Sequence, residues 1–227
     1  MYIIEDVILT FDLDWCSDEV LEDTLNLLGK RKSIFFVTHK SKVVDKMREN
    51  SNYELGIHPN FNFLLSGDFR YGNSIDEVLK YYLDIIPEAK SIRSHCLTQS
   101  SIILDNAKEL GLERAFNTLI PHTSNIELKP YKHSNGIIEY PHFWEDDVSI
   151  ECKWEWSAKR YLDYKGLKVF NFHPIHIFLN SEDLSRYTRA KPYLQDFNRL
   201  KEFVNKESYG VRDFFIDLLK GIDKRGE

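Results

Sequence analysis

The sequence ILTFDLDW at residues 8–15 joins an apolar run to two aspartates. The apolar stretch from Ile3 to Phe11 is typical of a buried β-strand. Side chains two apart on a strand point to the same face, so Asp12 and Asp14 are expected to project together from its end. Two carboxylates this close repel each other unless they share a cation or a proton. A structural alternative is an acidic cluster that helps to cap the helix beginning near Asp18.

Short β-rich runs alternate with longer amphipathic stretches along the rest of the chain. The expected later strands are 33–38, 53–57, 91–93, 115–119, 136–140 and 167–172. The expected helices are 18–28, 42–49, 74–86, 100–110, 191–205 and 211–222. This alternation is typical of βαβ units and a mainly parallel sheet of about seven strands. We therefore expect an α/β fold, either a distorted barrel or an open doubly wound sheet, with reactive residues just after the strand ends.

Composition describes a globular protein with a full core. The chain has 227 residues, of which 42% are hydrophobic and 29% charged. This length predicts a single domain over 1–227 with C-terminal helices from about residue 191. Lys and Arg number 30 against 36 Asp and Glu, a net charge of −6 that argues against a nucleic-acid partner. Aromatic residues make up 14% of the chain, a density found both in cores and in sugar-binding grooves.

The sequence also bears on where the protein works. No stretch approaches the roughly 20 apolar residues that span a bilayer, so we expect no membrane insertion. The first residues carry Glu5 and Asp6 and lack a basic start, which is unlike a secretory signal. Three cysteines without a CxxC spacing suit a reducing compartment. We expect a cytoplasmic protein, and nothing in the sequence points to an oligomeric state.

Three further strand ends carry candidate functional side chains. His58 follows the strand at 53–57, Arg93 ends the short strand at 91–93, and His173 follows the strand at 167–172. Each has a structural alternative, since a His can simply hydrogen-bond a turn and an Arg can form a structural ion pair. Together with the two aspartates, these residues make coincidence a poor explanation.

Five short stretches of the sequence resemble the motifs of a known family. TFDLDW, GIHPNFN, SIRSHC, EYPHFWEDD and NFHPIH are similar, in that order, to the five motifs of the polysaccharide deacetylases, carbohydrate esterase family 4 or NodB homology. The motifs extend from about residue 8 to residue 176. The resemblance implies a deformed (β/α) barrel and metal-assisted hydrolysis of an N-acetyl group on a sugar.

The resemblance also implies roles for individual residues. Asp12 matches the general base and Asp14 a metal ligand, with Leu13 inserted between them. His58 matches the first metal-binding His, while the second falls on Asn62. An amide oxygen is a harder ligand than imidazole, so this departure lowers zinc affinity or shifts the preference toward other divalent ions. Zinc remains the expected cofactor.

The remaining roles fall on the later motifs. Arg93 matches the arginine that steadies the base, and His173 resembles the general acid. Asp146 or Asp147 is expected to orient that acid, and we predict that it is Asp147. We expect substrate contacts from Trp144, His95 and His176, the latter two being also possible replacement ligands for the metal.

These expectations define one main hypothesis and two alternatives. The main hypothesis is a metal-dependent N-deacetylase acting on a free or nucleotide-linked sugar for surface polysaccharide, O-antigen or capsule, synthesis. The first alternative is a lapsed member that keeps the groove as a carbohydrate-binding module, motivated by Asn62. The second is a hydrolase of a non-sugar C–N bond, because fold does not settle chemistry.

Overall fold

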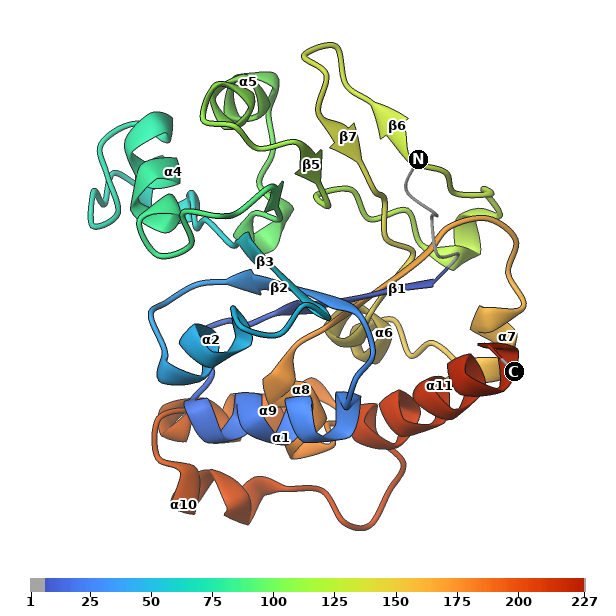
Figure 1. The fold of residues 1–227 in the computed structure, drawn as a ribbon. Helices are drawn as coiled ribbons and strands as arrows, with labels where there is room; N and C mark the ends of the chain where they lie inside the picture. Colours follow the sequence, from blue (N-terminus) through green and yellow to red (C-terminus); the bar gives the residue numbers. More distant parts are fainter. Residues whose placement is uncertain (1–6, 227) are drawn as a thin grey trace.

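The computed structural model describes residues 7–226 and contains a nine-stranded sheet surrounded by helices (Figure 1). The strands are β1 (Val7–Asp12), β2 (Ser33–Val37), β3 (Tyr53–Ile57), β4 (Ser91–Ile92), β5 (Arg114–Ala115), β6 (Tyr131–Lys132), β7 (Ile138–Glu139), β8 (Trp144–Glu145) and β9 (Lys168–Phe172). The α-helices are α1 (Asp18–Leu28), α2 (Lys42–Met47), α3 (Asn62–Leu65), α4 (Ile75–Leu83), α5 (Ser101–Glu109), α6 (Asp146–Glu151), α7 (Ala158–Leu162), α8 (Pro174–Leu179), α9 (Leu184–Ala190), α10 (Phe197–Leu200) and α11 (Val211–Gly226). Short 3₁₀ helices are η1 (His95–Leu97), η2 (His122–Ser124), η3 (Lys191–Tyr193) and η4 (Lys201–Phe203).

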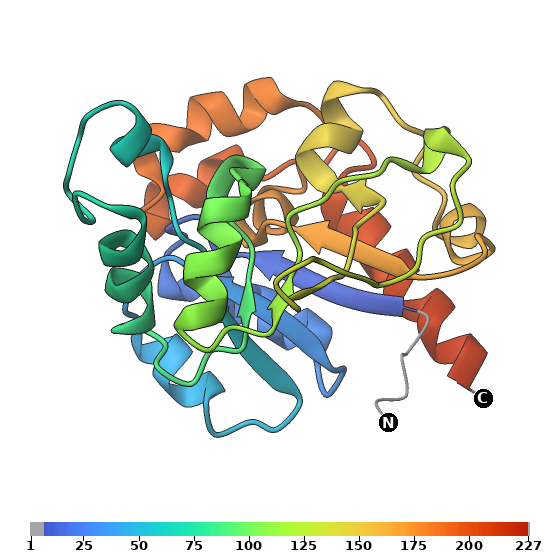
Figure 2. The same ribbon diagram turned by 90° about the horizontal axis from the view of Figure 1, so that it is seen from above.

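The strands form a curled half-barrel in the order β6-β7-β5-β4-β3-β2-β1-β9-β8. Neighbouring strands are parallel except β6, which runs antiparallel to β7. The expected mainly parallel α/β barrel-like fold is therefore confirmed. The described part of the chain has nine strands instead of about seven, because the two-residue strands β6 and β8 escape a pattern search. Figure 2 shows the strands side by side with helices around them.

The centre of the sheet consists of the strands that the apolar pattern predicts most strongly. β3 has the expected bounds, while β2 and β9 are each one residue shorter than expected. The first strand was expected from Ile3; β1 begins at Val7, and residues 3–6 lie outside the described part of the chain. All five residues of β2 and of β9 are buried, as expected where helices or loops cover both faces of a parallel sheet.

The helices begin and end at local signals in the sequence. α1 matches the expected range and is followed by Gly29 in a positive-φ conformation (φ 66°) that glycine adopts without strain. The Ser100 hydroxyl accepts a hydrogen bond from the Ile103 N–H at the start of α5. The continuous helix expected at 191–205 is instead broken into η3, α10 and η4. A 16-residue helix, α11, covers the expected C-terminal segment.

Aromatic side chains join the sheet to the C-terminal helix. The Phe172 ring lies 4.9 Å from that of Phe215, and the Trp144 ring lies 4.6 Å from that of Phe214. These contacts anchor α11 against β8 and β9, so much of the high aromatic content is core. No helix within residues 7–226 combines the length and the apolar character needed to cross a bilayer.

Candidate active site

Asp12 ends β1 and is held by a buried network from two other strands. Its exposed fraction is 2%, and Arg93, which follows β4, is fully buried. The Arg93 Nη1 lies 3.2 Å from Asp12 Oδ1, and the Asn171 amide of β9 donates to Asp12 Oδ2 at 2.8 Å. Arg93 also donates to the Asn171 Oδ1 and, at 2.9 Å, to the Thr10 hydroxyl. Because an unpaired buried charge is costly, this network fixes Asp12 in one position.

Asp14 lies at the centre of a second cluster, two residues later. Its backbone has φ 38°, which turns the chain sharply after β1. Oδ1 of Asp14 lies 3.2 Å from His58 Nε2 and 3.2 Å from His95 Nδ1. Burial would raise the pKa of Asp14, but the hydrogen bonds from both histidines and the charge of His173 outweigh it and lower the pKa well below its usual value. The carboxylate is therefore ionised at neutral pH.

His173 faces both aspartates and is oriented by Asp146. Its Nδ1 donates to Asp146 Oδ1 at 2.6 Å, and its backbone N–H donates to Asp146 Oδ2 at 2.7 Å. Its Nε2 is left facing Asp14 Oδ2 at 3.7 Å and Asp12 Oδ2 at 4.0 Å. Burial would lower the pKa of His173, but the nearby Asp146 and Asp14 raise it well above the ordinary value. The imidazole is thus a protonated group pointed into the acidic centre.

Glu145 and Asn171 extend this network behind Asp12. Asn171 Nδ2 donates to Glu145 Oε1 at 3.1 Å as well as to Asp12. Glu145 Oε2 lies 3.2 Å from Nε2 of the buried His142. Burial would raise the pKa of Glu145, but the hydrogen bond with His142 and the charges of His173 and Arg93 lower it to about 2. Neither residue was predicted from the sequence. Asn171 could have been, because it is a polar residue inside the apolar strand β9.

One cluster of this site fits a divalent metal ion. Ligand atoms of Asp14, His58 and His95 all lie within 4.8 Å of one another. One carboxylate with two imidazoles is a donor set that Zn²⁺ takes in catalytic sites, where a fourth position stays open. The buried His58 Nδ1 has no hydrogen-bond partner among the described residues. The side chains of His95 and Asp14 are 24% and 18% exposed, so this cluster is reachable from outside.

Asn62 and His95, which were expected as a metal ligand and a substrate contact, have different neighbours in the structure. The Asn62 side chain is exposed, and its Oδ1 accepts a hydrogen bond from the Thr98 hydroxyl at 3.2 Å. His95 instead lies against Asp14, in the turn η1, where Cys96 has φ 54°. The His95 imidazole, which belongs to the third motif, thus lies beside Asp14, where the family resemblance had suggested a residue of the second motif. His95 was expected as a substrate contact and as a possible replacement ligand, and its place beside Asp14 favours the second of these roles.

The residue that orients His173 is Asp146 and not Asp147. Asp146 is fully buried and makes both hydrogen bonds to His173, whereas Asp147 Oδ1 accepts from the Val148 N–H. Burial and the neighbouring Glu145 raise the pKa of Asp147 to about 7. The two adjacent residues begin α6 and point in different directions, which the sequence could not distinguish.

The expected substrate contacts also change. Trp144 is fully buried against Phe214, so it belongs to the core and cannot stack on a sugar. His176 lies next to His173, with ring centroids 5.7 Å apart, but it is buried and its Nδ1 is 3.0 Å from the Ser181 hydroxyl. Burial lowers the pKa of His176 to about 4, so this imidazole is neutral. Because it is buried, His176 offers little surface to a substrate.

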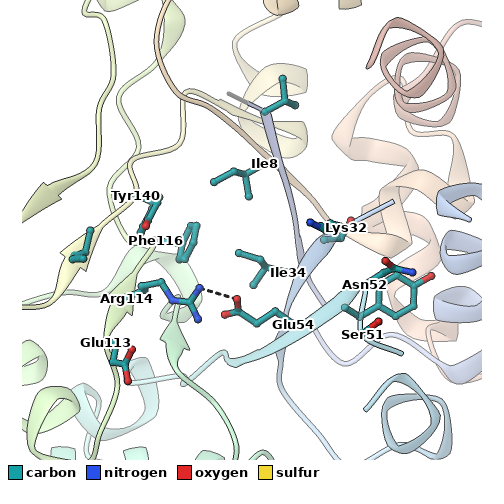
Figure 3. A pocket seen from close by; sticks show the side chains of 14 residues that line it. Ile8, Lys32, Ile34, Ser51, Asn52, Glu54, Glu113, Arg114, Phe116 and Tyr140 are labelled. Atoms are coloured by element: carbon teal, nitrogen blue, oxygen red, sulfur yellow. Dashed lines mark ion pairs between the residues drawn. The ribbon is translucent and has the colours of Figure 1, made fainter. Parts of the chain in front are cut away.

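The opposite end of the half-barrel holds a separate cavity of about 490 Å³ (Figure 3). Its walls include Ile8 and Ile34 near the starts of β1 and β2, and Phe116, which follows β5. An ion pair of 2.9 Å joins Arg114 and Glu54 across it. The candidate catalytic residues follow the carboxyl ends of the same strands, so none of them lines this cavity.

Comparisons with known proteins bear on this arrangement. The chain matches the family model described as WbmS-like polysaccharide deacetylase over residues 9–191. A WbmS protein from Bordetella bronchiseptica, provisionally described as a polysaccharide deacetylase involved in O-antigen biosynthesis, is 36% identical. The match covers 95% of this chain and 90% of that one, with a TM-score of 0.88.

More distant solved structures are similar over most of the chain. A family 4 carbohydrate esterase from Streptomyces lividans, solved with acetate, is 11% identical with a TM-score of 0.48, covering 95% of this chain and 88% of that one. No curated protein matches significantly. The family model and the Bordetella structure together cover the strand ends described above, and the chain therefore belongs to the WbmS-like polysaccharide deacetylases.

Proposed function

We propose that this protein is a metal-dependent deacetylase that hydrolyses the N-acetyl group of a sugar. The observation that carries the proposal is the convergence of Asp12, Asp14, His58, His95 and His173 at one end of the half-barrel. These residues supply a carboxylate base, a candidate metal cluster and a protonated imidazole within one site. Amide hydrolysis by this route needs each of these groups.

The candidate metal cluster supplies the electrophilic part of the chemistry. Asp14, His58 and His95 would hold the ion. A divalent ion held there would polarise the amide carbonyl and would lower the pKa of water in the site. This donor set favours zinc, because its third member, His95, would offer an imidazole, a better zinc ligand than the amide of Asn62.

Asp12 is the proposed base. Its carboxylate is buried next to the cluster, with Oδ1 3.6 Å from His58 Nδ1. The Arg93 guanidinium and the Asn171 amide offset its negative charge and fix its orientation. A base held in this way takes a proton from an attacking water without first having to reorient.

His173 is the proposed acid. The amine leaves a tetrahedral intermediate easily only when its nitrogen receives a proton. His173 carries that proton on Nε2, which faces the two aspartates, while Asp146 holds Nδ1 and so fixes the direction of the ring. Asp146 therefore acts through His173 as a positioning residue.

Two observations support a proposal for the biological setting: the similarity to the Bordetella protein and the absence of disulfides among the three cysteines, all of which lie within residues 7–226. The Bordetella protein is provisionally linked to O-antigen biosynthesis, which favours a precursor of surface polysaccharide as the substrate here. Cys16, Cys96 and Cys152 are unpaired, which favours a reducing compartment such as the cytoplasm. A nucleotide-linked or otherwise activated N-acetylated sugar would then meet the enzyme before export.

Acetate release tests the proposal. The zinc-loaded protein is incubated with N-acetylglucosamine, N-acetylgalactosamine and their uridine diphosphate conjugates, and acetate is measured by a coupled assay. We expect release with at least one of these sugars, and a loss of about 10²–10⁴-fold in Asp12→Asn. An Asp12→Asn variant that folds, binds zinc and keeps full activity would remove the base from the scheme. Absence of acetate with every sugar would contradict deacetylation of these substrates.

A further inference from the structure

We infer that Trp15 is the stacking platform for the sugar ring that carries the acetamido group, an inference that rests on the proposed function and names a specificity residue for it. The indole of Trp15 lies beside the candidate metal cluster. Its ring centroid is 5.4 Å from that of His95, with the two planes at 76°. His95 in turn lies 3.2 Å from Asp14. A sugar ring whose acetamido carbonyl reaches the cluster on the His95 side would lie close to this indole.

The backbone holds Trp15 in this position. Asp14 and Trp15 both have positive φ, 38° and 56°, a conformation that is uncommon for residues with side chains. The Trp15 N–H donates to the Thr38 hydroxyl at 3.0 Å, and the Trp15 carbonyl accepts from Gln195 Nε2 at 2.6 Å. One turn thus directs Asp14 into the cluster and places the indole at its edge.

The Trp15 side chain is suited to contact a ligand. It is partly exposed, in contrast to the fully buried Trp144. Burial raises the pKa of the Tyr71 hydroxyl, the Trp15 side chain is close enough to offset this rise in part, and the Tyr71 ring lies 4.7 Å from that of the exposed Tyr81. An aromatic surface therefore leads from the cluster toward the outside of the molecule.

The other tryptophans are placed elsewhere. Trp154 packs on His122, with ring centroids 4.5 Å apart, and Trp156 packs on Tyr209 at 6.0 Å. Trp154 and Trp156 line a cavity next to Tyr209 instead of the cluster. Of the four tryptophans, which all lie in the described range, Trp15 is the one in ring contact with a candidate ligand.

The chemistry of a sugar ring explains why an indole would be used here. One face of a pyranose carries C–H groups, which are weakly positive and apolar. These groups pack on the negative face of an aromatic ring, and indole offers the largest such face among side chains. The acetamido ring would thereby be oriented with its carbonyl toward Asp14, His58 and His95. Binding of this kind contributes to KM more than to kcat, because it is made equally in the ground state and the transition state.

Two measurements test the inference independently. In the first, tryptophan fluorescence of the zinc-loaded protein is titrated with the same four N-acetylated sugars. We expect saturable quenching by at least one sugar, retained in Trp156→Phe and lost in Trp15→Phe. This readout does not depend on turnover, so it supports the platform even if no acetate is released. A titration in which no sugar perturbs the fluorescence, or in which Trp15→Phe responds like the wild type, overturns the inference.

The second measurement is steady-state acetate release by Trp15→Ala, Trp15→Phe and Trp156→Phe. We expect KM to rise about tenfold in Trp15→Ala with kcat within about threefold, and most of the loss to be recovered in Trp15→Phe. Zinc content is measured for each variant, to show that His95 has kept its place. An unchanged KM in a zinc-replete Trp15→Ala refutes the platform and leaves the proposed deacetylation standing.

Discussion

The two ends of the half-barrel are built from the same strands but have different contents. At the carboxyl end, β1, β4 and β9 place Asp12, Arg93 and Asn171 in a buried hydrogen-bonded network. At the amino end, β3 and β5 place Glu54 and Arg114 in an ion pair whose side chains are 31% and 27% exposed. Asp12 and Arg93 are almost completely buried, whereas both partners of the amino-end pair are partly exposed. This difference in burial supports the proposal that the carboxyl end holds the active site.

The largest expected difference between the two ends is in stability. Arg93→Met leaves Asp12 buried without its cation and is expected to cost about 3–5 kcal/mol of unfolding free energy. Arg114→Met removes a partly exposed pair and is expected to cost about 0–1 kcal/mol. The unfolding free energies of both variants and of the wild type are measured by urea denaturation. Equal losses would show that the buried network is no more important to the fold than the pair at the other end.

The next largest expected difference between the two ends is in deacetylase activity. Asp146→Asn removes the carboxylate that fixes the tautomer and direction of His173, and we expect kcat to fall about 10²-fold or more. Glu54→Gln, which alters the amino-end ion pair, is the matched control and should keep kcat within about twofold. The assay is acetate release at neutral pH. A loss of the same size in Glu54→Gln would mean that the effect comes from general destabilisation.

A smaller expected effect is the pH dependence of stability, which involves two histidines of the carboxyl end, His173 and His176. Asp146 and Asp14 raise the pKa of His173, whereas burial lowers that of His176 to about 4. Since the folded pKa of His173 lies above the unfolded value of about 6.5, its protonation stabilises the fold fully below that pH. This contribution is lost as the pH rises through the folded pKa.

Imidazole NMR of the metal-free protein checks these directions. His173 should titrate above its ordinary pKa and His176 well below it, and Asp146→Asn should lower the pKa of His173. The stability difference between wild type and Asp146→Asn should narrow at alkaline pH, where His173 is neutral in both. A His173 that titrates below 6 in the wild type would contradict the proposed acid.

The site residues that could be predicted from the sequence are those that lie directly at the end of a β-strand. Asp12, His58 and Arg93 each follow an apolar run, and parallel strands bring such ends together at one edge of the sheet. The structure does bring them together, although their chemical roles remain proposals. The core strands were equally predictable, because continuous apolar runs leave little choice of structure.

The parts that the sequence could not predict depend on turns and on helix rotation. Whether Asp146 or Asp147 meets His173 depends on how α6 starts, and adjacent residues on a helix point about 100° apart. His95 reaches Asp14 through the positive-φ turn at Cys96, which no strand or helix pattern indicates. Trp144 and Trp15 look alike as aromatic residues near motifs, and only the packing of α11 shows that Trp144 belongs to the core.

The most direct test of the central claim is to locate the metal. Crystals soaked in zinc are measured at the zinc absorption edge, and the anomalous peak is placed relative to the two ends of the half-barrel. We predict one peak at the carboxyl end, with oxygen of Asp14 and nitrogen of His58 and His95 about 2.0–2.2 Å away. A peak coordinated by Asn62 in place of His95, or one at the amino-end cavity with the carboxyl end empty, would contradict the account.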